Sequence, residues 1–306
     1  KHTDIAASLQ KVLDEVIYNI AKEAKKITKH NSLCLAGGVA LNCVSNGFLL
    51  KKNLFKNIWV QPAAGDAGGS LGVAYYILRD ICKYEKRKID IYEDEMKGSF
   101  LGPSYSEEEI IDSLKKYNIQ PIKYSGDSLF KKISELISNK KIIGLFQGKL
   151  EFGPRALGSR SIIGDPRDPE MQKKMNLKIK FRESFRPFAP AVLDEHFDEW
   201  FKLDENKKYN SQNFSPYMLF VSKIKHDKLL KNIEKTKSIE DINIQRSLIP
   251  AVTHVDFSAR IQTVSKKYNP FFYKIIKNFY ELTSVPIIIN TSFNIRGEPI
   301  VCSVED

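Results

Sequence analysis

The chain has 306 residues, of which 42% are hydrophobic and 28% charged, a balance typical of soluble globular proteins and sufficient for one large domain or two ordinary ones. Its formal net charge of +11 favours anionic partners without choosing among nucleic acid, membrane surfaces and phosphorylated metabolites. No apolar run approaches the roughly 20 residues of a membrane-spanning helix, and the first residues lack the apolar segment of a signal peptide. We therefore expect a cytoplasmic protein that makes no membrane contact.

Two strand–glycine turn–helix units follow an amphipathic helix in the first 97 residues. Each strand runs directly into a glycine pair, in LAGGVALN and in AAGDAGGSLG. This order is typical of an α/β layer whose binding sites lie at the carboxyl ends of the strands. The predicted elements are helices over 3–29, from 40 onward and over 70–81, and strands over 32–36 and 58–61.

A charged segment without clear periodicity, 84–98, predicts a linker, which divides the chain into domains of residues 1–97 and 98–306. Ser106 and Glu109 predict a capping box at the first helix of the second domain. Polar surface insertions are predicted over 202–214 and 226–245. The predicted elements are helices over 107–117, 128–138 and 270–283, and strands over 142–146, 188–193, 217–223, 257–264 and 285–290.

The four cysteines are widely spaced and form no CxxC pair. This spacing predicts reduced, structural thiols, not a disulfide framework or a zinc site. The four positions are Cys34, Cys43, Cys82 and Cys302.

The turn-rich segment EFGPRALGSRSIIGDPRDP (151–169) predicts an oxyanion-binding loop. Glycines let the backbone approach a ligand closely, and arginine forks match pairs of phosphate or carboxylate oxygens. The arginines of this segment are Arg155, Arg160 and Arg167.

A second cationic segment, NLKIKFRESFRPFAP, follows. Extended backbone would place Lys178, Lys180 and Arg182 on one face, with Arg186 further along. A solvated basic surface is the alternative interpretation. The glycines, prolines and phenylalanines among these cations favour a walled pocket for a phosphate-type ligand.

Two polar turns near the end of the chain add further candidates. In INTSFNIRGEPIV, donors and acceptors follow directly after a buried strand, at Asn290, Thr291, Ser292 and Asn294, with Arg296 beside them. THVDFSARIQTV contributes Arg260 and His254, and a single histidine of this kind is equally compatible with a structural role.

The glycine turns of the first domain could bind phosphate through backbone N–H groups, helped by the helix dipole. Gly37 and Gly38 belong to the first turn, and Asp66 lies in the second, where a carboxylate could hold a metal ion beside the phosphates. The alternative is a pair of tight packing turns.

In chain order, GGVALNCVSN, PAAGDAGGSLG, EFGPRALGSRSII, FRPFAP, THVDFSARIQTV and NTSFNIRGEPIV resemble the carbamoyltransferase family, over nearly the whole chain. This family includes NodU-type nodulation proteins and the O-carbamoyltransferases of cephamycin (CmcH-type) and tobramycin biosynthesis. The resemblance implies an α/β (α+β) fold. Residues 1–97 would be the C-terminal portion of an actin/sugar-kinase/Hsp70-like (ASKHA) transfer domain, and residues 98–306 a YrdC-like domain with a mixed twisted sheet.

The resemblance further implies a two-step enzyme. The YrdC-like domain would combine carbamoyl phosphate with ATP, giving carbamoyl-adenylate and pyrophosphate with the help of Mg²⁺. The transfer domain would then pass the carbamoyl group to a hydroxyl of a sugar, an antibiotic or a capsular metabolite.

Site residues are assigned by matching the family's motifs. Carbamoyl phosphate and the adenylate would be gripped by Lys180, Arg186, Arg260, Asn290 and Ser292. Arg155, Arg160, Arg182 and Arg296 fall in the same motifs and are assigned to substrate binding, while Gly37, Gly38 and Asn42 match the nucleotide-facing loop. Asp66 matches an aspartate that shares a divalent metal ion, iron being one option, with two upstream histidines.

The five histidines of this chain contain no HxxxH pair, which is the spacing expected of those two metal ligands. The chain also lacks an initiator methionine and stops shortly after a motif. We therefore expect it to be a piece of a longer protein.

Two other functions fit parts of the sequence. The net charge and the shared domain type favour a threonylcarbamoyl-type tRNA modification enzyme, although no basic stripe interleaved with aromatics supports nucleic-acid binding. The missing histidines favour a non-catalytic nucleotide-binding remnant. A homodimer is compatible with all of these functions.

Overall fold

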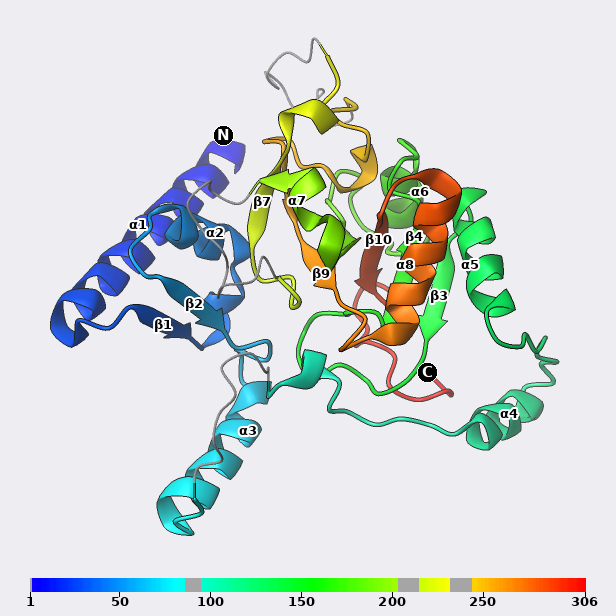
Figure 1. The fold of residues 1–306 in the computed structure, drawn as a ribbon, viewed down its shortest axis with the longest axis horizontal. Coiled ribbons are helices and arrows are strands. Elements are labelled where there is room, and N and C mark those ends of the chain that lie inside the picture. The colour runs from blue at the N-terminus through cyan, green and yellow to red at the C-terminus, as the bar shows by residue number, and fades with distance from the viewer. Residues whose placement is uncertain (1, 86–94, 203–214, 232–243) are drawn as a thin grey trace.

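The computed structural model describes residues 2–85, 95–202, 215–231 and 244–306 (Figure 1). The linker predicted over 84–98 and the insertions predicted over 202–214 and 226–245 lie largely outside the described residues. The helices are α1 (His2–Thr28), α2 (Cys43–Lys51), α3 (Ala67–Tyr76), α4 (Glu107–Lys116), α5 (Ser128–Ser138), α6 (Met171–Lys178), α7 (Phe197–Trp200) and α8 (Pro270–Thr283). The strands are β1 (Ser32–Leu35), β2 (Asn57–Val60), β3 (Ile143–Phe146), β4 (Arg160–Gly164), β5 (Ala189–Leu193), β6 (Phe201–Lys202), β7 (Val221–Ile224), β8 (Ser258–Arg260), β9 (Gln262–Val264) and β10 (Ile287–Ser292).

The first part of the chain is a small α/β unit. Strands β1 and β2 pair in parallel, and α1 packs against α2. The helix expected from residue 40 begins as a 3₁₀ turn over Gly38–Leu41, and α2 starts only at Cys43. Helix α2 begins at Cys43 because the Asn42 side chain caps it. This side chain accepts hydrogen bonds from the N–H groups of Val44 and Ser45, both at 3.1 Å.

Helices α1 and α3 carry large apolar side chains that are open to solvent in this structure. Helix α3 extends away from the β1–β2 unit (Figure 1) and has no buried residue. The exposed apolar residues are Ile5, Leu9, Val12, Val16, Ile20 and Ile27 on α1, and Val73, Tyr75 and Tyr76 on α3. Within the described part of the chain, no helix is both long and apolar enough to cross a lipid bilayer.

A five-stranded mixed sheet forms the centre of the second part, in the order β3-β4-β10-β5-β9. All neighbours are antiparallel except β5 and β9, which run parallel. Helices α5 and α8 lie side by side on one face of the sheet (Figure 1), where α8 buries Phe272, Ile275, Ile276 and Phe279. A second apolar cluster, which includes Met171 and Met175 of α6, covers the opposite face. The predicted mixed sheet is confirmed.

The structure differs from the sequence-based predictions at three places in this part. The single strand expected over 257–264 is split into β8, which pairs with β7, and β9, which pairs with β5. Strand β4 was not predicted, because its flanking glycines and arginines indicate a loop. The extended segment expected over 178–182 is instead the end of α6 followed by a turn, so Lys178, Lys180 and Arg182 do not share one face.

One apolar core joins the two parts of the chain. It contains Leu49 and Phe55 from the first part and Leu157, Ala189 and the segment 217–220 from the second. The buried Asn46 side chain donates to the carbonyl oxygen of Leu219 at 3.0 Å, which fixes α2 beside β7. These contacts hold the N-terminus of α2 in place against the second part.

Gly47 is required for this contact, because a Cβ there would lie 2.7 Å from Cγ2 of Val221 and 3.1 Å from its carbonyl oxygen. We expect Gly47→Ala to lower the free energy of unfolding by about 1–3 kcal/mol, although alanine is the better helix former. Urea unfolding measures the change. Gly72→Ala in α3 is the matched control, since a Cβ there meets nothing within 4 Å, and it should raise stability by up to about 1 kcal/mol. Equal effects of the two substitutions would contradict the packing argument.

The cysteines are free thiols, and none of the four is buried. Cys34 and Cys82 are exposed, while Cys43 and Cys302 are half-buried. Free thiols agree with the prediction of reduced cysteines, while the predicted structural role of the four side chains stays a prediction.

Candidate anion-binding site

Most of the predicted cations lie near the end of the sheet where β10 finishes and β4 and β5 begin. Lys180 is buried, with 5% of its surface exposed. Its Nζ donates to the side-chain oxygen of Ser292 at 3.2 Å, to the carbonyl oxygen of Asn294 and to Asn294 Oδ1, both at 2.9 Å, and to the Ser292 carbonyl. Burial, and then the charge of Arg182, lowers the pKa of Lys180 to about 8. Neutral oxygens thus orient the ammonium group, and no carboxylate of the described residues pairs with it.

Arg182 lies on the turn that follows α6. Its Nε donates to Oδ1 of the fully buried Asn176 at 2.6 Å, and its guanidinium stacks on the ring of Phe188 at 5.0 Å. Asn176 also donates to the carbonyl oxygens of Ser184 and Arg186, at 3.0 and 2.8 Å. A single buried amide therefore shapes the whole cationic turn. Arg186 itself is exposed at the rim and pairs with Glu183 at 2.9 Å.

Arg155 and Arg260 extend the cationic cluster towards the first part of the chain. Arg155 Nη2 donates to the carbonyl oxygen of Leu41 at 3.3 Å, while its Nε is buried without a hydrogen-bond partner. Burial lowers the pKa of Arg155. Burial, followed by the charges of Arg155 and Arg182, lowers the pKa of Arg260 to about 10, with Cys43 acting in the opposite direction.

These four residues, Lys180, Arg182, Arg155 and Arg260, are called the cation cluster below. Neighbouring members depress one another's pKa, as Arg182 does to Lys180 and to Arg260. Among the described residues, no carboxylate contributes to the pKa of Lys180, Arg155 or Arg260. Repulsion between fixed, partly desolvated cations is relieved when an anion binds, so the cluster is arranged for a multiply charged oxyanion.

Asn290 and Gln262 shape the loop beneath the cluster. Asn290 is fully buried and donates to the carbonyl oxygen of Ala156 at 3.1 Å and to Gln262 Oε1 at 2.7 Å, while its own Oδ1 has no partner. Gln262 in turn donates to the carbonyl oxygen of Leu157 at 2.8 Å. Sequence reasoning missed Gln262, because a lone glutamine in a short strand carries no distinctive signal.

Glu151, which sequence reasoning also missed, holds the glycine-rich loop in shape. Its buried carboxylate accepts hydrogen bonds from the N–H groups of Leu157 at 2.7 Å, Ser159 at 2.8 Å and Arg160 at 3.3 Å. An acidic residue at the start of a cationic, glycine-rich motif was the available signal.

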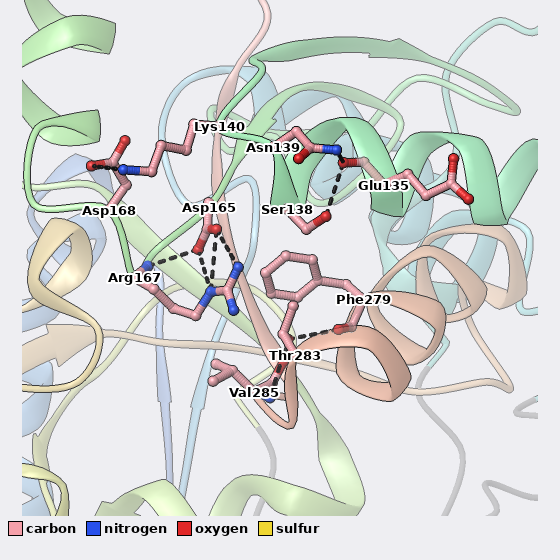
Figure 2. Close-up of polar contacts among 10 residues, drawn as sticks. All are labelled: Glu135, Ser138, Asn139, Lys140, Asp165, Arg167, Asp168, Phe279, Thr283 and Val285. Carbon is pink, nitrogen blue, oxygen red and sulfur yellow. Dashed lines mark hydrogen bonds and ion pairs between the residues drawn. The ribbon is translucent and has the colours of Figure 1, made fainter.

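Arg160 and Arg167 do not join the cation cluster. The Arg160 guanidinium lies 3.6 Å from the centre of the Phe146 ring, and its Nη1 donates to the carbonyl oxygens of Gln147 and Gly148 at 3.0 and 3.3 Å. Arg167 follows the other end of β4, where both oxygens of Asp165 accept its hydrogen bonds at 2.6–3.2 Å (Figure 2). Arg167 therefore has its own counter-charge and lies away from the site.

Beside Arg167, Lys140 pairs with the mostly buried carboxylate of Asp168 at 3.5 Å (Figure 2). The GDPRDP motif is thus an ion-paired turn that packs against α5 and α8, where the Arg167 guanidinium lies 5.2 Å from the Phe279 ring. Its two aspartates act as counter-ions, and the motif supplies no cation to the cluster.

The glycine turns of the first part leave open space. Gly37 has a φ of +95°, and a Cβ at Gly37 or Gly38 would meet nothing within 4 Å. The Asn42 side chain is already engaged, because its Oδ1 caps α2 and its Nδ2 donates to Gln10 at 3.0 Å. Asp66 is exposed at the start of α3, and among the residues that the structure describes no three His, Cys, Asp or Glu side chains gather to hold a metal ion.

Two remaining candidate residues do not belong to the cation cluster. Arg296 is exposed on the turn after β10. Burial lowers the pKa of His254 to about 4, so the imidazole is neutral at physiological pH, and its Nδ1 lies 3.4 Å from the Ser258 hydroxyl. His254 therefore adds no charge to the site.

The lowered pKa of Lys180 predicts a pH dependence of anion binding. Below about pH 8 the ammonium form persists and affinity should be constant; above it, affinity should fall by up to about tenfold per pH unit as the proton is lost. Titration calorimetry with sulfate, which does not itself ionise in this range, measures the profile. In Lys180→Arg, where the guanidinium stays charged, the decline should disappear. An unchanged decline in that variant would assign the titration to another group.

The fold and the site define an α/β protein with a cluster of cationic side chains between two parts of one chain, and sequence comparison gives the family. The family described as "Carbamoyltransferase C-terminus" matches residues 134–306, and the family described as "Carbamoyltransferase N-terminus" matches residues 1–75. The chain belongs to the carbamoyltransferase family.

Relatives of this chain are longer proteins. An uncharacterized protein of Synechocystis sp. is 48% identical over all of this chain and 49% of its own length. Nodulation protein NolO of Bradyrhizobium diazoefficiens is 38% identical over all of this chain and 51% of its own length, and nodulation protein U of the same organism is 28% identical over 96% and 45%. The chain thus spans about half the length of the curated relatives it matches.

Among solved structures, HypF of T. kodakarensis aligns with a TM-score of 0.37 at 15% identity, over 61% of this chain and 19% of that one. A likeness this weak supports no transfer of function.

Proposed function

We propose that this protein acts in ATP-dependent O-carbamoyl transfer. In the first step, carbamoyl phosphate, ATP and one water would give carbamoyl-adenylate, inorganic phosphate and pyrophosphate. In the second, the carbamoyl group would pass to a hydroxyl of a sugar, an antibiotic or a capsular metabolite. Membership of the carbamoyltransferase family supports the group transferred. The observation that carries the proposal is the cation cluster, in which no carboxylate of the described residues acts on Lys180, Arg155 or Arg260.

The activation step needs this kind of site. Carbamoyl phosphate and ATP are both polyanions, so fixed cations must offset their repulsion and the charge that develops on the leaving pyrophosphate. Lys180 and Arg260 would bind phosphoryl oxygens directly, with Arg186 at the rim of the site. Ser292 and Asn294 hold the Lys180 ammonium in place, so it needs little reorganisation when substrate arrives.

Arg182 and Arg155 would bind further substrate oxygens at the two ends of the cluster. Asn290 would act mainly by shaping the loop below it, although its unpartnered Oδ1 is free to accept from a ligand. Positioning and electrostatics suffice for such a reaction, and no side-chain nucleophile is required.

The proposed division of labour assigns residues 1–97 to an ASKHA-type transfer domain and residues 98–306 to a YrdC-like activation domain. The open glycine turn at Gly37 and Gly38 would face the nucleotide in the first of these, and Asp66 would be one ligand of its metal ion. Among the described residues no three possible ligands gather to hold a metal ion, so no step is assigned to that metal. Magnesium would enter as the counter-ion of ATP.

Carbamoyl-phosphate-dependent exchange of labelled pyrophosphate into ATP tests the activation step with the purified protein and Mg²⁺. Exchange that requires carbamoyl phosphate is the expected result. Exchange that proceeds equally well without carbamoyl phosphate, or that is absent although ATP binds, would overturn the assignment. Competition by inorganic phosphate serves as a control for occupancy of the cation cluster.

A further inference from the structure

A polar network joins α1 to the first turn of α2. The Asp14 carboxylate accepts from the Ser45 hydroxyl at 2.6 Å and from Gln10 Nε2 at 2.7 Å, and Gln10 Nε2 also lies 3.0 Å from the Ser45 hydroxyl oxygen. Gln10 Oε1 in turn accepts from Asn42 Nδ2 at 3.0 Å. Ser45 is fully buried and the other three side chains are half-buried, so these hydrogen bonds are partly shielded from water.

Asn42 is the residue through which this network reaches the cation cluster. Its N–H donates to the carbonyl oxygen of Val39 at 3.0 Å and shares one rigid peptide plane with the Leu41 carbonyl. The Leu41 carbonyl oxygen accepts from Arg155 Nη2 at 3.3 Å, and Arg155 makes no other hydrogen bond to a residue that the structure describes. A rotation of the backbone at Asn42 would therefore move the acceptor that orients Arg155.

Arg155 needs this orientation, because its other contacts leave it free to turn. A bond of 3.3 Å is long, and Arg155 Nε is buried without a hydrogen-bond partner. On the other side of the turn, the buried Asn46 side chain donates to the carbonyl oxygen of Ala40 at 2.8 Å and fixes that peptide. The freedom that remains lies at Leu41 and Asn42, where the network from α1 acts.

We propose that Gln10 and Asp14 are positioning residues for Arg155. By fixing Asn42 they hold the Leu41 carbonyl, and with it the guanidinium, in the direction that a multiply charged oxyanion at the cation cluster requires. Neither side chain hydrogen-bonds to a member of the cluster in the described structure, so each acts on the anion only through Asn42 and Arg155. This inference rests on the proposed function, because it takes the cluster as the site of the phosphate-bearing substrates.

A double-mutant cycle with Arg155 tests this role, with titration calorimetry of sulfate binding as the measurement. Arg155→Gln should weaken sulfate binding about tenfold, since it removes a charge-assisted donor. Gln10→Ala should weaken binding about threefold to fivefold, because the guanidinium stays but must be ordered when the anion binds. In the Arg155→Gln background, Gln10→Ala should have no further effect on sulfate affinity, because the group that it orients is gone.

An exchange of the two side chains tests the network itself. Gln10→Glu alone places two carboxylates side by side and should weaken sulfate binding. Combined with Asp14→Asn, it again sets an amide against a carboxylate, and sulfate affinity should return to within about twofold of the unaltered protein. Asn19→Ala is the matched control, since it removes an exposed amide from the same helix and should leave sulfate affinity unchanged.

The outcomes separate this inference from the proposed function. Unchanged sulfate affinity in Arg155→Gln would remove Arg155 from the anion site, and both would then lose their basis. If Arg155→Gln weakens binding but Gln10→Ala does not, or if Gln10→Ala has the same effect in both backgrounds, only the positioning role is overturned. Urea unfolding shows whether the variants are folded. Should Gln10→Ala not fold, Gln10→Glu and the exchanged pair, each measured with and without Arg155→Gln, decide the same question.

Discussion

Lys180→Met is expected to lower carbamoyl-phosphate-dependent pyrophosphate exchange by at least about a thousandfold. Methionine keeps the length and much of the volume of the lysine side chain but removes its charge. The loss should be this large because Lys180 is buried and is held by four oxygen contacts that fix its direction. Radiolabel exchange at saturating ATP measures the effect.

Two controls separate charge from folding. Lys178→Met removes a charge from the exposed end of α6 and should leave exchange within about twofold of the unaltered protein. The Lys180→Met variant itself leaves carbonyl oxygens of Ser292 and Asn294 without their donor, a cost of about 1–3 kcal/mol that urea unfolding would reveal. A folded Lys180→Met protein that exchanges at the normal rate would remove Lys180 from the activation site.

Glu151→Gln is expected to lower the free energy of unfolding by about 2–4 kcal/mol. The buried carboxylate accepts hydrogen bonds from the backbone N–H groups of Leu157, Ser159 and Arg160 in the glycine-rich loop. Oε1 accepts from all three N–H groups, and Oε2 accepts from Arg160 alone, so the amide carbonyl of glutamine can keep the first set but its NH₂ would face the Arg160 N–H. The substitution also removes the negative charge that strengthens every one of these hydrogen bonds. Urea unfolding checks the stability, and sulfate affinity checks whether Arg155 has lost its place in the cluster.

Glu170→Gln is the matched control, because Glu170 is exposed before α6 and its side chain makes no capping bond. It should change stability by no more than about 0.5 kcal/mol. If Glu151→Gln behaves like Glu170→Gln, the carboxylate does not organise the loop, and the shape of 151–159 must come from Asn290 and Gln262.

Local patterns were enough to find most helices and the cationic segments. The apolar spacing of α1, α5 and α8 predicts those helices, and the Ser106–Glu109 capping box that the sequence indicates is present in the structure at the start of α4. The segments that carry Lys180, Arg260 and Asn290 were also recognised as binding candidates. Each of these signals lies within a few residues, where backbone periodicity and side-chain capping act.

The sequence-based predictions that failed have a different cause. Strand β4 and the break between β8 and β9 depend on pairing with strands far away in the sequence, which local periodicity does not encode. The expected common face of Lys178, Lys180 and Arg182 failed because Asn176 and α6 set the turn.

By itself, the sequence determined that this protein gathers cations, glycines and amides in turn-rich segments suited to phosphate-like ligands, and its motifs pointed to the carbamoyltransferase family. Only the tertiary structure decided which cations meet. Arg155 and Arg260 come together beside α2 because one apolar core joins the two parts of the chain, whereas Arg167, in the same motif as Arg155, is carried to the other end of β4 and neutralised by Asp165. The physical reason is that the charge and hydrogen-bonding groups of a side chain are set by its residue type. The distance between two such side chains instead depends on non-local strand pairing and core packing.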